Sequence, residues 1–77
     1  MTKIIDFYSP NCAPCTLLKK ELEGLDNVEY VNVMDDFEKA LEFSIRKSPT
    51  VVFLKNGEEI NRFSGFKTKE EIASYLE

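Results

Sequence analysis

The chain contains no histidine and no tryptophan, and only two cysteines occur among its 77 residues. Without histidine there can be no histidine general base, no Cys-His nucleophile pair and no histidine metal ligand. Six Phe and three Tyr supply the bulky side chains that a small core needs. The reactive chemistry of this chain therefore has to be sought in its two cysteines.

Long apolar runs and blocks of one charge are also absent. The longest aliphatic and aromatic run is residues 51–54, whereas a membrane-spanning helix needs about 20 apolar residues. No basic segment, apolar stretch and cleavage site follow Met1, so we expect a cytoplasmic protein with no secretion signal and no membrane partner. Ten basic and fourteen acidic residues give a net charge of −4, which makes nucleic acid a poor partner.

The length of 77 residues suits a single domain, residues 1–77, which we expect to be monomeric. Residues 3–8 form an apolar run typical of a buried strand, and a helical pattern begins at Cys12 and ends near Gly24. One face of this helix is predicted to be buried, with Cys15, Leu18, Leu22 and Leu25. The charged residues point away: Lys19, Lys20, Glu21 and Glu23. Residues 28–33 predict a second strand, parallel to the first.

The second half of the chain predicts two short helices and a hairpin. Asp35 and Glu38 resemble a capping pattern that opens a helix. Four residues of that helix are predicted to be available to the core: Phe37, Ala40, Leu41 and Phe43. Residues 50–55 and 59–64 predict antiparallel strands joined at Asn56-Gly57. A capping box of Thr68 and Glu71 opens a last helix, whose inward residues are predicted to be Ile72, Ala73 and Leu76.

The predicted fold class is therefore α/β, in the order β-α-β-α-β-β-α, with a four-stranded mixed sheet and three helices. In this order Cys12 and Cys15 stand three positions apart, where the first strand gives way to the first helix. A disulfide that closes so short a loop removes only about 2 kcal/mol of denatured-state entropy, so the pair is a weak structural staple.

Three interpretations of the pair remain: a redox-inert core pair, a metal site, and a reversible disulfide. A zinc site would need ligands from a second chain or from carboxylates. Reversible exchange is favoured by the position of the pair after a strand in a βαβ unit. Cys12 lies at a helix N-terminus, where unpaired N–H groups and the helix dipole favour a thiolate. Cys15, one turn further on, can attack a mixed disulfide formed at Cys12 and release the reduced partner.

Asp6 and Pro49 each allow two interpretations. Asp6 lies within an otherwise apolar strand and can be an outward-facing carboxylate on the alternating pattern. It can also be a buried acid with a raised pKa that exchanges protons with Cys15. Pro49 precedes a predicted strand, and X-Pro bonds are cis in only about 5–6% of cases, so a trans bond is the general expectation.

From Lys3 to Leu76 the chain resembles the thioredoxins. Asp6-Phe7 and Cys12-Ala-Pro-Cys15 are similar to the family's Asp-Phe and Cys-Gly-Pro-Cys block. Residues 45–58 are similar to its cis-proline segment and hairpin, and residues 63–66 to its closing glycine region. The resemblance implies a compact thioredoxin fold with Cys12 as nucleophile, Cys15 as resolving cysteine and Asp6 as the buried acid.

The same resemblance implies a binding site for a substrate strand. It implies that Pro49 is cis, that the backbone at Ser48 pairs with the substrate, and that Gly65 leaves room for it. We add Asn11 to these expected substrate-binding residues, although the family usually has Trp at this position. Further departures are Ala13 for Gly, Ser48 for an apolar residue, and Tyr30 where a lysine often partners the buried acid.

Because Cys12 comes so early, the family's opening strand and helix have no counterpart, and this short form also resembles glutaredoxins and the small redoxins that serve ribonucleotide reductase. Residues 64–67 resemble a segment of the latter group. The last turn, however, lacks the glutaredoxin double glycine and following Asp, and Pro49 is not preceded by Thr-Val.

The resemblance thus implies a protein-disulfide reductase that binds no cofactor and works through a Cys12–Cys15 disulfide. It implies electrons from NADPH through a flavoprotein thioredoxin reductase, and disulfide-containing client proteins as partners, with ribonucleotide reductase as one candidate. Two alternatives remain. One is a glutaredoxin-like electron donor dedicated to ribonucleotide reductase, and the other is a thioredoxin-fold interaction module whose cysteines are dispensable.

Overall fold

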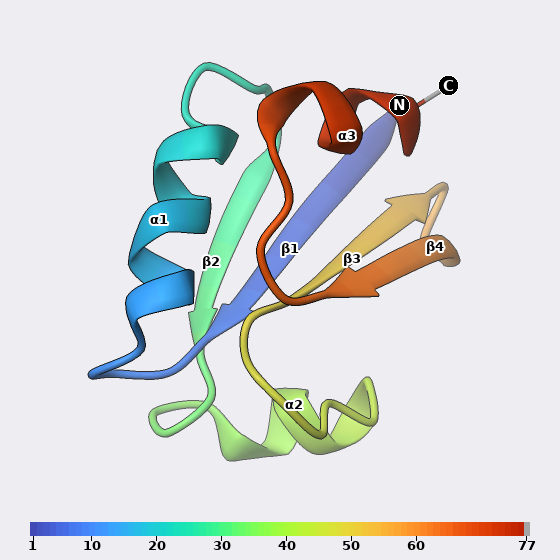
Figure 1. Ribbon diagram of the computed structural model, residues 1–77. Helices are drawn as coiled ribbons and strands as arrows, with labels where there is room; N and C mark the ends of the chain where they lie inside the picture. The colour runs from blue at the N-terminus through green and yellow to red at the C-terminus, as the bar shows by residue number, and fades with distance from the viewer. Residues whose placement is uncertain (77) are drawn as a thin grey trace.

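The computed structural model describes residues 1–76 and contains seven elements in the predicted order (Figure 1). The strands are β1 (Thr2–Tyr8), β2 (Val28–Asn32), β3 (Thr50–Lys55) and β4 (Glu58–Ser64), and the helices are α1 (Ala13–Leu22), α2 (Phe37–Glu42) and α3 (Lys69–Ser74). The sheet order is β2-β1-β3-β4, with β1 parallel to β2 and antiparallel to β3, and β4 antiparallel to β3. The predicted α/β fold with a mixed four-stranded sheet is therefore confirmed.

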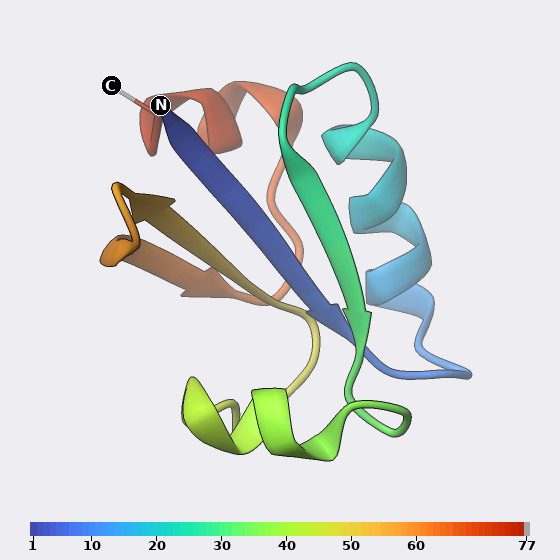
Figure 2. The ribbon, with the colours of Figure 1, turned by 180° about the vertical axis from the view of Figure 1, so that it is seen from behind.

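Helices α1 and α3 cover one face of the sheet, and α2 covers the other (Figures 1 and 2). The alternation of side chains along β1 divides the core accordingly. The cluster under α1 and α3 consists of Ile4, Leu18, Leu22, Val51, Phe53, Phe63 and Ile72. The cluster on the α2 side consists of Ile5, Phe7, Val31 and Val52. The central strands β1 and β3 are thus buried on both faces, so strand alternation alone does not decide which of their residues meet water.

Helix α3 closes the first face with an aromatic stack. Tyr75 lies with its ring centroid 5.4 Å from that of Phe53 and 5.1 Å from that of Phe63. The predicted capping box is present: the Glu71 N–H donates to Thr68 Oγ1 at 3.3 Å, and the Thr68 N–H donates to Glu71 Oε1 at 3.0 Å.

One inward residue of this helix was predicted wrongly. Ile72 is fully buried and Leu76 is half-buried, but Ala73 is exposed. The helix has only six residues and buries Ile72, while Leu76, just beyond the end of the helix, packs against the same cluster. Ala73 is rotated by about 100° from Ile72 around the helix axis and so faces water.

Helix α2 also differs from the prediction. Its N-cap is Asp36 rather than Asp35: Asp36 Oδ1 accepts the Lys39 N–H at 3.1 Å. Ala40 is buried and the Phe43 ring packs 5.4 Å from that of Phe7, as expected of core residues.

The other two residues assigned to the core of α2 are exposed, Phe37 by 65% and Leu41 by 61%. Their prediction as core residues is wrong because a helix of six residues covers the sheet with little more than one turn. Ala40 is the buried residue of the helix. Phe43 and Ile45, which follow the helix, pack against the cluster on the α2 side.

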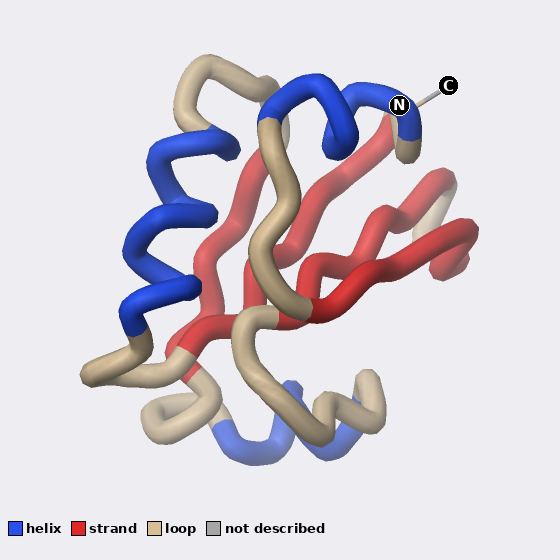
Figure 3. The backbone as a smooth tube through the Cα atoms, viewed as in Figure 1, coloured by secondary structure: helices blue, strands red, loops and turns tan. Residues whose placement is uncertain are grey.

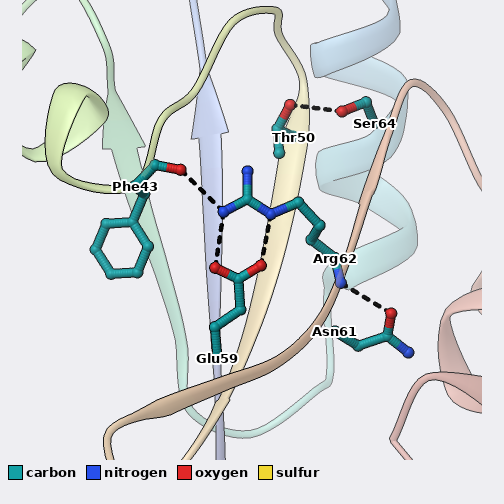
Figure 4. Close-up of polar contacts among 6 residues, drawn as sticks. All are labelled: Phe43, Thr50, Glu59, Asn61, Arg62 and Ser64. Atoms are coloured by element: carbon teal, nitrogen blue, oxygen red, sulfur yellow. Dashed lines mark hydrogen bonds and ion pairs between the residues drawn. The ribbon is translucent and has the colours of Figure 1, made fainter.

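A guanidinium joins β4 to the end of α2 (Figure 4). Arg62 Nη2 donates to the Phe43 carbonyl at 2.9 Å and to Glu59 Oε1 at 2.7 Å, and Arg62 Nε donates to Glu59 Oε2. The hydrogen bond from Arg62 lowers the pKa of the Glu59 carboxyl. Polar contacts therefore supplement the smaller apolar cluster on this side of the sheet.

Two loops that are far apart in sequence meet at the same end of the central strands β1 and β3 (Figure 3). The first leaves the end of β1, and the second, after α2, enters β3, because Phe7 pairs with Thr50 in the antiparallel register. The fold thus brings residues 9–12 and residues 44–49 together. Within residues 1–76, no helix is both long enough and apolar enough to cross a membrane.

Candidate active site

Cys12 and Cys15 form a disulfide at the start of α1, with their Cα atoms 5.2 Å apart. Cys12 is the N-cap residue and is half-buried, whereas Cys15 is 5% exposed. The Cys15 N–H donates to Cys12 Sγ at 3.2 Å, and the Thr16 N–H closes the first helical turn onto the Cys12 carbonyl at 3.1 Å. A backbone N–H at a helix N-terminus thus points at the more accessible sulfur, which favours negative charge there.

Asp6 is buried next to this pair, with 1% of its surface exposed. It faces the helix α1 side of the sheet and shares an open pocket with Cys12 and Cys15. The outward-facing interpretation is therefore wrong: the strand alternates as predicted, but α1 covers the face to which Asp6 points. Asp6 Oδ1 has no hydrogen-bond partner among the described residues.

Burial raises the pKa of the Asp6 carboxyl from 3.8 to about 6, because the charged form loses its hydration. The positive charge of Lys19 acts in the opposite direction. Lys19 is exposed, as the sequence predicted for its helix face, but its ammonium lies over the Tyr30 ring, 5.2 Å from the centroid. Both residues line the pocket that holds Asp6.

Three of the four expected substrate-binding residues form a second group beside the pocket: Ser48, Pro49 and Gly65. The Ser48–Pro49 bond is cis, as the resemblance implied, and Pro49 is buried. Gly65 has a φ of +85°, in the left-handed region, and its N–H donates to the Pro49 carbonyl at 2.8 Å. The Ser48 hydroxyl shares a hydrogen bond of 2.6 Å with that of Ser9, which lines the pocket of the cysteines.

Asn11 stands directly before the disulfide, exposed and with a φ of 56°. Asparagine tolerates this left-handed conformation better than most residues. Asn11 lines the same pocket as Asp6, Cys12 and Cys15. The predicted site residues therefore fall into two adjoining groups, with Ser9 linking them.

Sequence reasoning missed Ser9, and it did not assign Lys19 to the site. Lys19 follows Cys15 by four positions, which puts both on the same side of the helix, and this spacing was the available signal. Ser9 gave none, because its partner lies 39 positions away. Among residues 1–76 no group of three or more Cys, Asp or Glu is arranged to hold a metal ion.

The seven-element fold, the disulfide at the start of α1 and the cis-proline loop beside it define a dithiol protein of the thioredoxin fold. A family model described as Thioredoxin matches residues 1–77, and the chain belongs to the thioredoxin family.

Individual relatives agree with this assignment. The chain is 29% identical over 80 residues to mitochondrial thioredoxin of Bos taurus, with 95% of this chain and 48% of that protein covered. It is 31% identical over 75 residues to thioredoxin of Chlamydia caviae, with 90% and 74% covered. The structure of Fasciola hepatica thioredoxin superimposes with a TM-score of 0.89 at 28% identity, covering 97% of this chain and 77% of that one. The chain thus spans about half the length of the mitochondrial relatives it matches.

Proposed function

We propose that this chain is a thiol-disulfide oxidoreductase that reduces disulfides in client proteins, as a single thioredoxin-like domain over residues 1–77. The observation that carries the proposal is the Cys12–Cys15 disulfide at the N-terminus of α1, with a backbone N–H directed at Cys12 Sγ. The accessible sulfur of the pair is Cys12 and the buried one is Cys15. This difference in exposure favours Cys12 as the nucleophile and Cys15 as the resolving cysteine.

The reaction begins with the reduced dithiol. The Cys12 thiolate attacks one sulfur of a client disulfide, forms a mixed disulfide and releases the other client sulfur as a thiolate, which takes up a proton. The Cys15 thiol loses its proton and its sulfur attacks Cys12 Sγ, which releases the second client thiolate. The client gains two electrons and two protons, and the chain is left with the Cys12–Cys15 disulfide.

We assign Asp6 as the group that accepts the proton of the Cys15 thiol. It lies in the same pocket as Cys15, and its pKa of about 6 leaves most of the carboxyl ionised at neutral pH and able to accept a proton. A base with a pKa close to the working pH can also return the proton when the disulfide is reduced again. Burial is what brings the pKa of Asp6 into this range.

The client strand is proposed to lie along the cis-proline loop. Ser48 is half-buried beside Pro49, and a Cβ added at Gly65 would meet nothing within 4 Å, so the space in front of this glycine is open. In this arrangement the Ser48 backbone pairs with the client, and Asn11 contacts it next to the disulfide. The Ser9–Ser48 hydrogen bond joins the loop that precedes the disulfide to the cis-proline loop.

The dithiol has to be regenerated by an external reductant. We propose NADPH, acting through a flavoprotein thioredoxin reductase, as the source of the two electrons, with the chain itself holding no cofactor. The cytoplasm is the proposed compartment, because a reducing environment keeps such a dithiol in its reduced form. The physiological client is proposed to be a disulfide-containing protein, and ribonucleotide reductase is a candidate.

Insulin reduction tests this proposal. With NADPH and thioredoxin reductase, the chain should reduce insulin disulfides, and Cys12→Ser should abolish turnover while the variant remains folded. Parallel reactions with glutathione and its reductase separate the two electron sources. Turnover with glutathione alone would favour the glutaredoxin-like donor. Full biological activity of both Cys12→Ser and Cys15→Ser would instead favour the interaction module.

A further inference from the structure

Lys19 is held over the pocket that contains Asp6. It follows Cys15 by one helical turn, so the two side chains leave α1 on the same side. Its Nζ lies 5.2 Å from the centroid of the Tyr30 ring, which is within cation–π range. The aliphatic stem of a lysine can lie along a pocket wall while its ammonium stays at the water boundary. The Tyr30 ring thus gives this exposed side chain a defined position.

Tyr30 itself brings no positive charge to Asp6, although it is the residue that pairs with Asp6 in the parallel register of β1 and β2. Among the described residues that line the pocket, Lys19 is the one with a positive charge. None of the three ion pairs between described residues involves Lys19. The Lys19 ammonium therefore lies at the pocket and is not neutralised by an ion pair with another described carboxylate.

We propose that Lys19 is a positioning residue for the reaction: from helix α1, seated on the Tyr30 ring, it stabilises the charged form of the Asp6 carboxyl. The inference rests on the proposed role of Asp6 as proton acceptor for Cys15. Strand β2 offers an aromatic ring at position 30, and the ring serves as the platform for a lysine that comes from the neighbouring helix.

The other titratable groups around Asp6 do not replace this charge. Tyr8 from β1 and Tyr30 from β2 line the pocket, and burial, followed by the charges of Asp6 and Glu23, raises the pKa of the Tyr30 hydroxyl, which therefore stays neutral. On β3 the residue that pairs with Asp6 is Val51, which carries no charge. Lys19 is what opposes the effect of burial on Asp6.

The direct test is an NMR titration of the Asp6 side-chain carboxyl carbon in the oxidised protein, where Cys12 and Cys15 are joined and do not titrate. The wild-type midpoint is expected at about 6. In Lys19→Gln the midpoint should rise by about half a pH unit, the size expected for two charges separated by several ångströms in a largely aqueous medium. High salt should shrink the difference, because the ammonium is exposed.

Lys20 provides the matched control, since it is the next lysine of α1 and does not line the pocket. Lys20→Gln should leave the Asp6 midpoint unchanged, and Lys19→Arg, which keeps the charge, should restore it. In the reduced protein, the acidic limb of the pH profile for client reduction should move upward in Lys19→Gln. In an Asp6→Asn background the same substitution should produce no further shift.

Three results would overturn the inference: an unchanged Asp6 midpoint in Lys19→Gln, an equal shift in Lys20→Gln, or a pH-profile shift that persists without Asp6. The third would mean that Lys19 acts on the cysteines directly. A shifted carboxyl titration in a protein that reduces no client disulfide would support the Lys19–Asp6 coupling and count against the proposed function. The two proposals can therefore fail separately.

Discussion

The two faces of the sheet are covered in different ways. On one face, the ten-residue helix α1 and the helix α3 bury a cluster that ends in the stacked rings of Phe53 and Tyr75. On the other face, the six-residue helix α2 leaves Phe37 and Leu41 exposed and is joined to β4 through Arg62. Asp6 lies on the first face, where a helix withdraws its carboxyl from water. The layer of α1 and α3 is the thicker of the two, and its side of the sheet holds both the larger apolar cluster and the buried acid.

The largest expected effect contrasts one leucine from each layer. Leu18→Ala on α1 removes a fully buried side chain and should reduce the free energy of unfolding by about 2–5 kcal/mol. Leu41→Ala on α2, whose side chain is 61% exposed, should change it by less than about 0.5 kcal/mol. Denaturant unfolding of the oxidised proteins measures both. Equal losses would mean that the two layers contribute alike, contrary to the comparison.

The next effect concerns Asp6, the buried acid on the face that α1 and α3 cover. The Asp6 carboxyl has a pKa of 3.8 when unfolded and about 6 when folded, so the folded state binds the extra proton between these values. Stability from this group therefore falls as the pH rises from about 4 to 6 and stays low above that range. Above pH 7 the ionised Asp6 carboxyl lowers the free energy of unfolding by at most about 3 kcal/mol.

Replacing this acid should remove the cost. Asp6→Asn should be more stable than the wild type above pH 7, and its advantage should vanish below about pH 4. Unfolding of both proteins across a pH series gives the difference, in which the exposed carboxylates common to both cancel. A variant that is less stable than the wild type at pH 8 would contradict the buried, unpartnered state of Asp6.

The smallest expected effect on the free energy of unfolding is on the face that α2 covers. Arg62→Ala removes the hydrogen bonds to Glu59 and to the Phe43 carbonyl and should cost about 1 kcal/mol or less, since the ion pair is about one-third exposed. The loss should decrease in high salt. Arg46→Ala is the control, because Arg46 takes part in none of the three ion pairs between described residues. Matching losses in the two variants would remove Arg62 as a specific link to α2.

The order and type of all seven elements could be predicted from the sequence. Local signals were sufficient there, as in the capping box of Thr68 and Glu71 or the hairpin at Asn56-Gly57. The exposure of Phe37 and Leu41 could not be predicted in this way. It depends on how much of α2 reaches the sheet, and this is set by tertiary packing rather than by the helical repeat.

The candidate site was predictable where it depended on spacing and unpredictable where it depended on distant contacts. The spacing of Cys12 and Cys15, together with their position between a strand and a helix, favoured the disulfide over the two other interpretations. The burial of Asp6 required knowing that α1 covers its side of the strand. The contact of Lys19 with Tyr30 depends on side chains that meet only in the folded protein, and the sequence had assigned Lys19 to an outward face.

Trapping a mixed disulfide tests the central claim most directly. The account holds that Cys12 attacks the client and Cys15 resolves the adduct. Cys15→Ser, incubated with a disulfide-containing client and analysed by mass spectrometry of the non-reduced adduct, should therefore accumulate client bound to Cys12, whereas Cys12→Ser should accumulate none. An adduct at Cys15 in Cys12→Ser, with none at Cys12 in Cys15→Ser, would contradict the account.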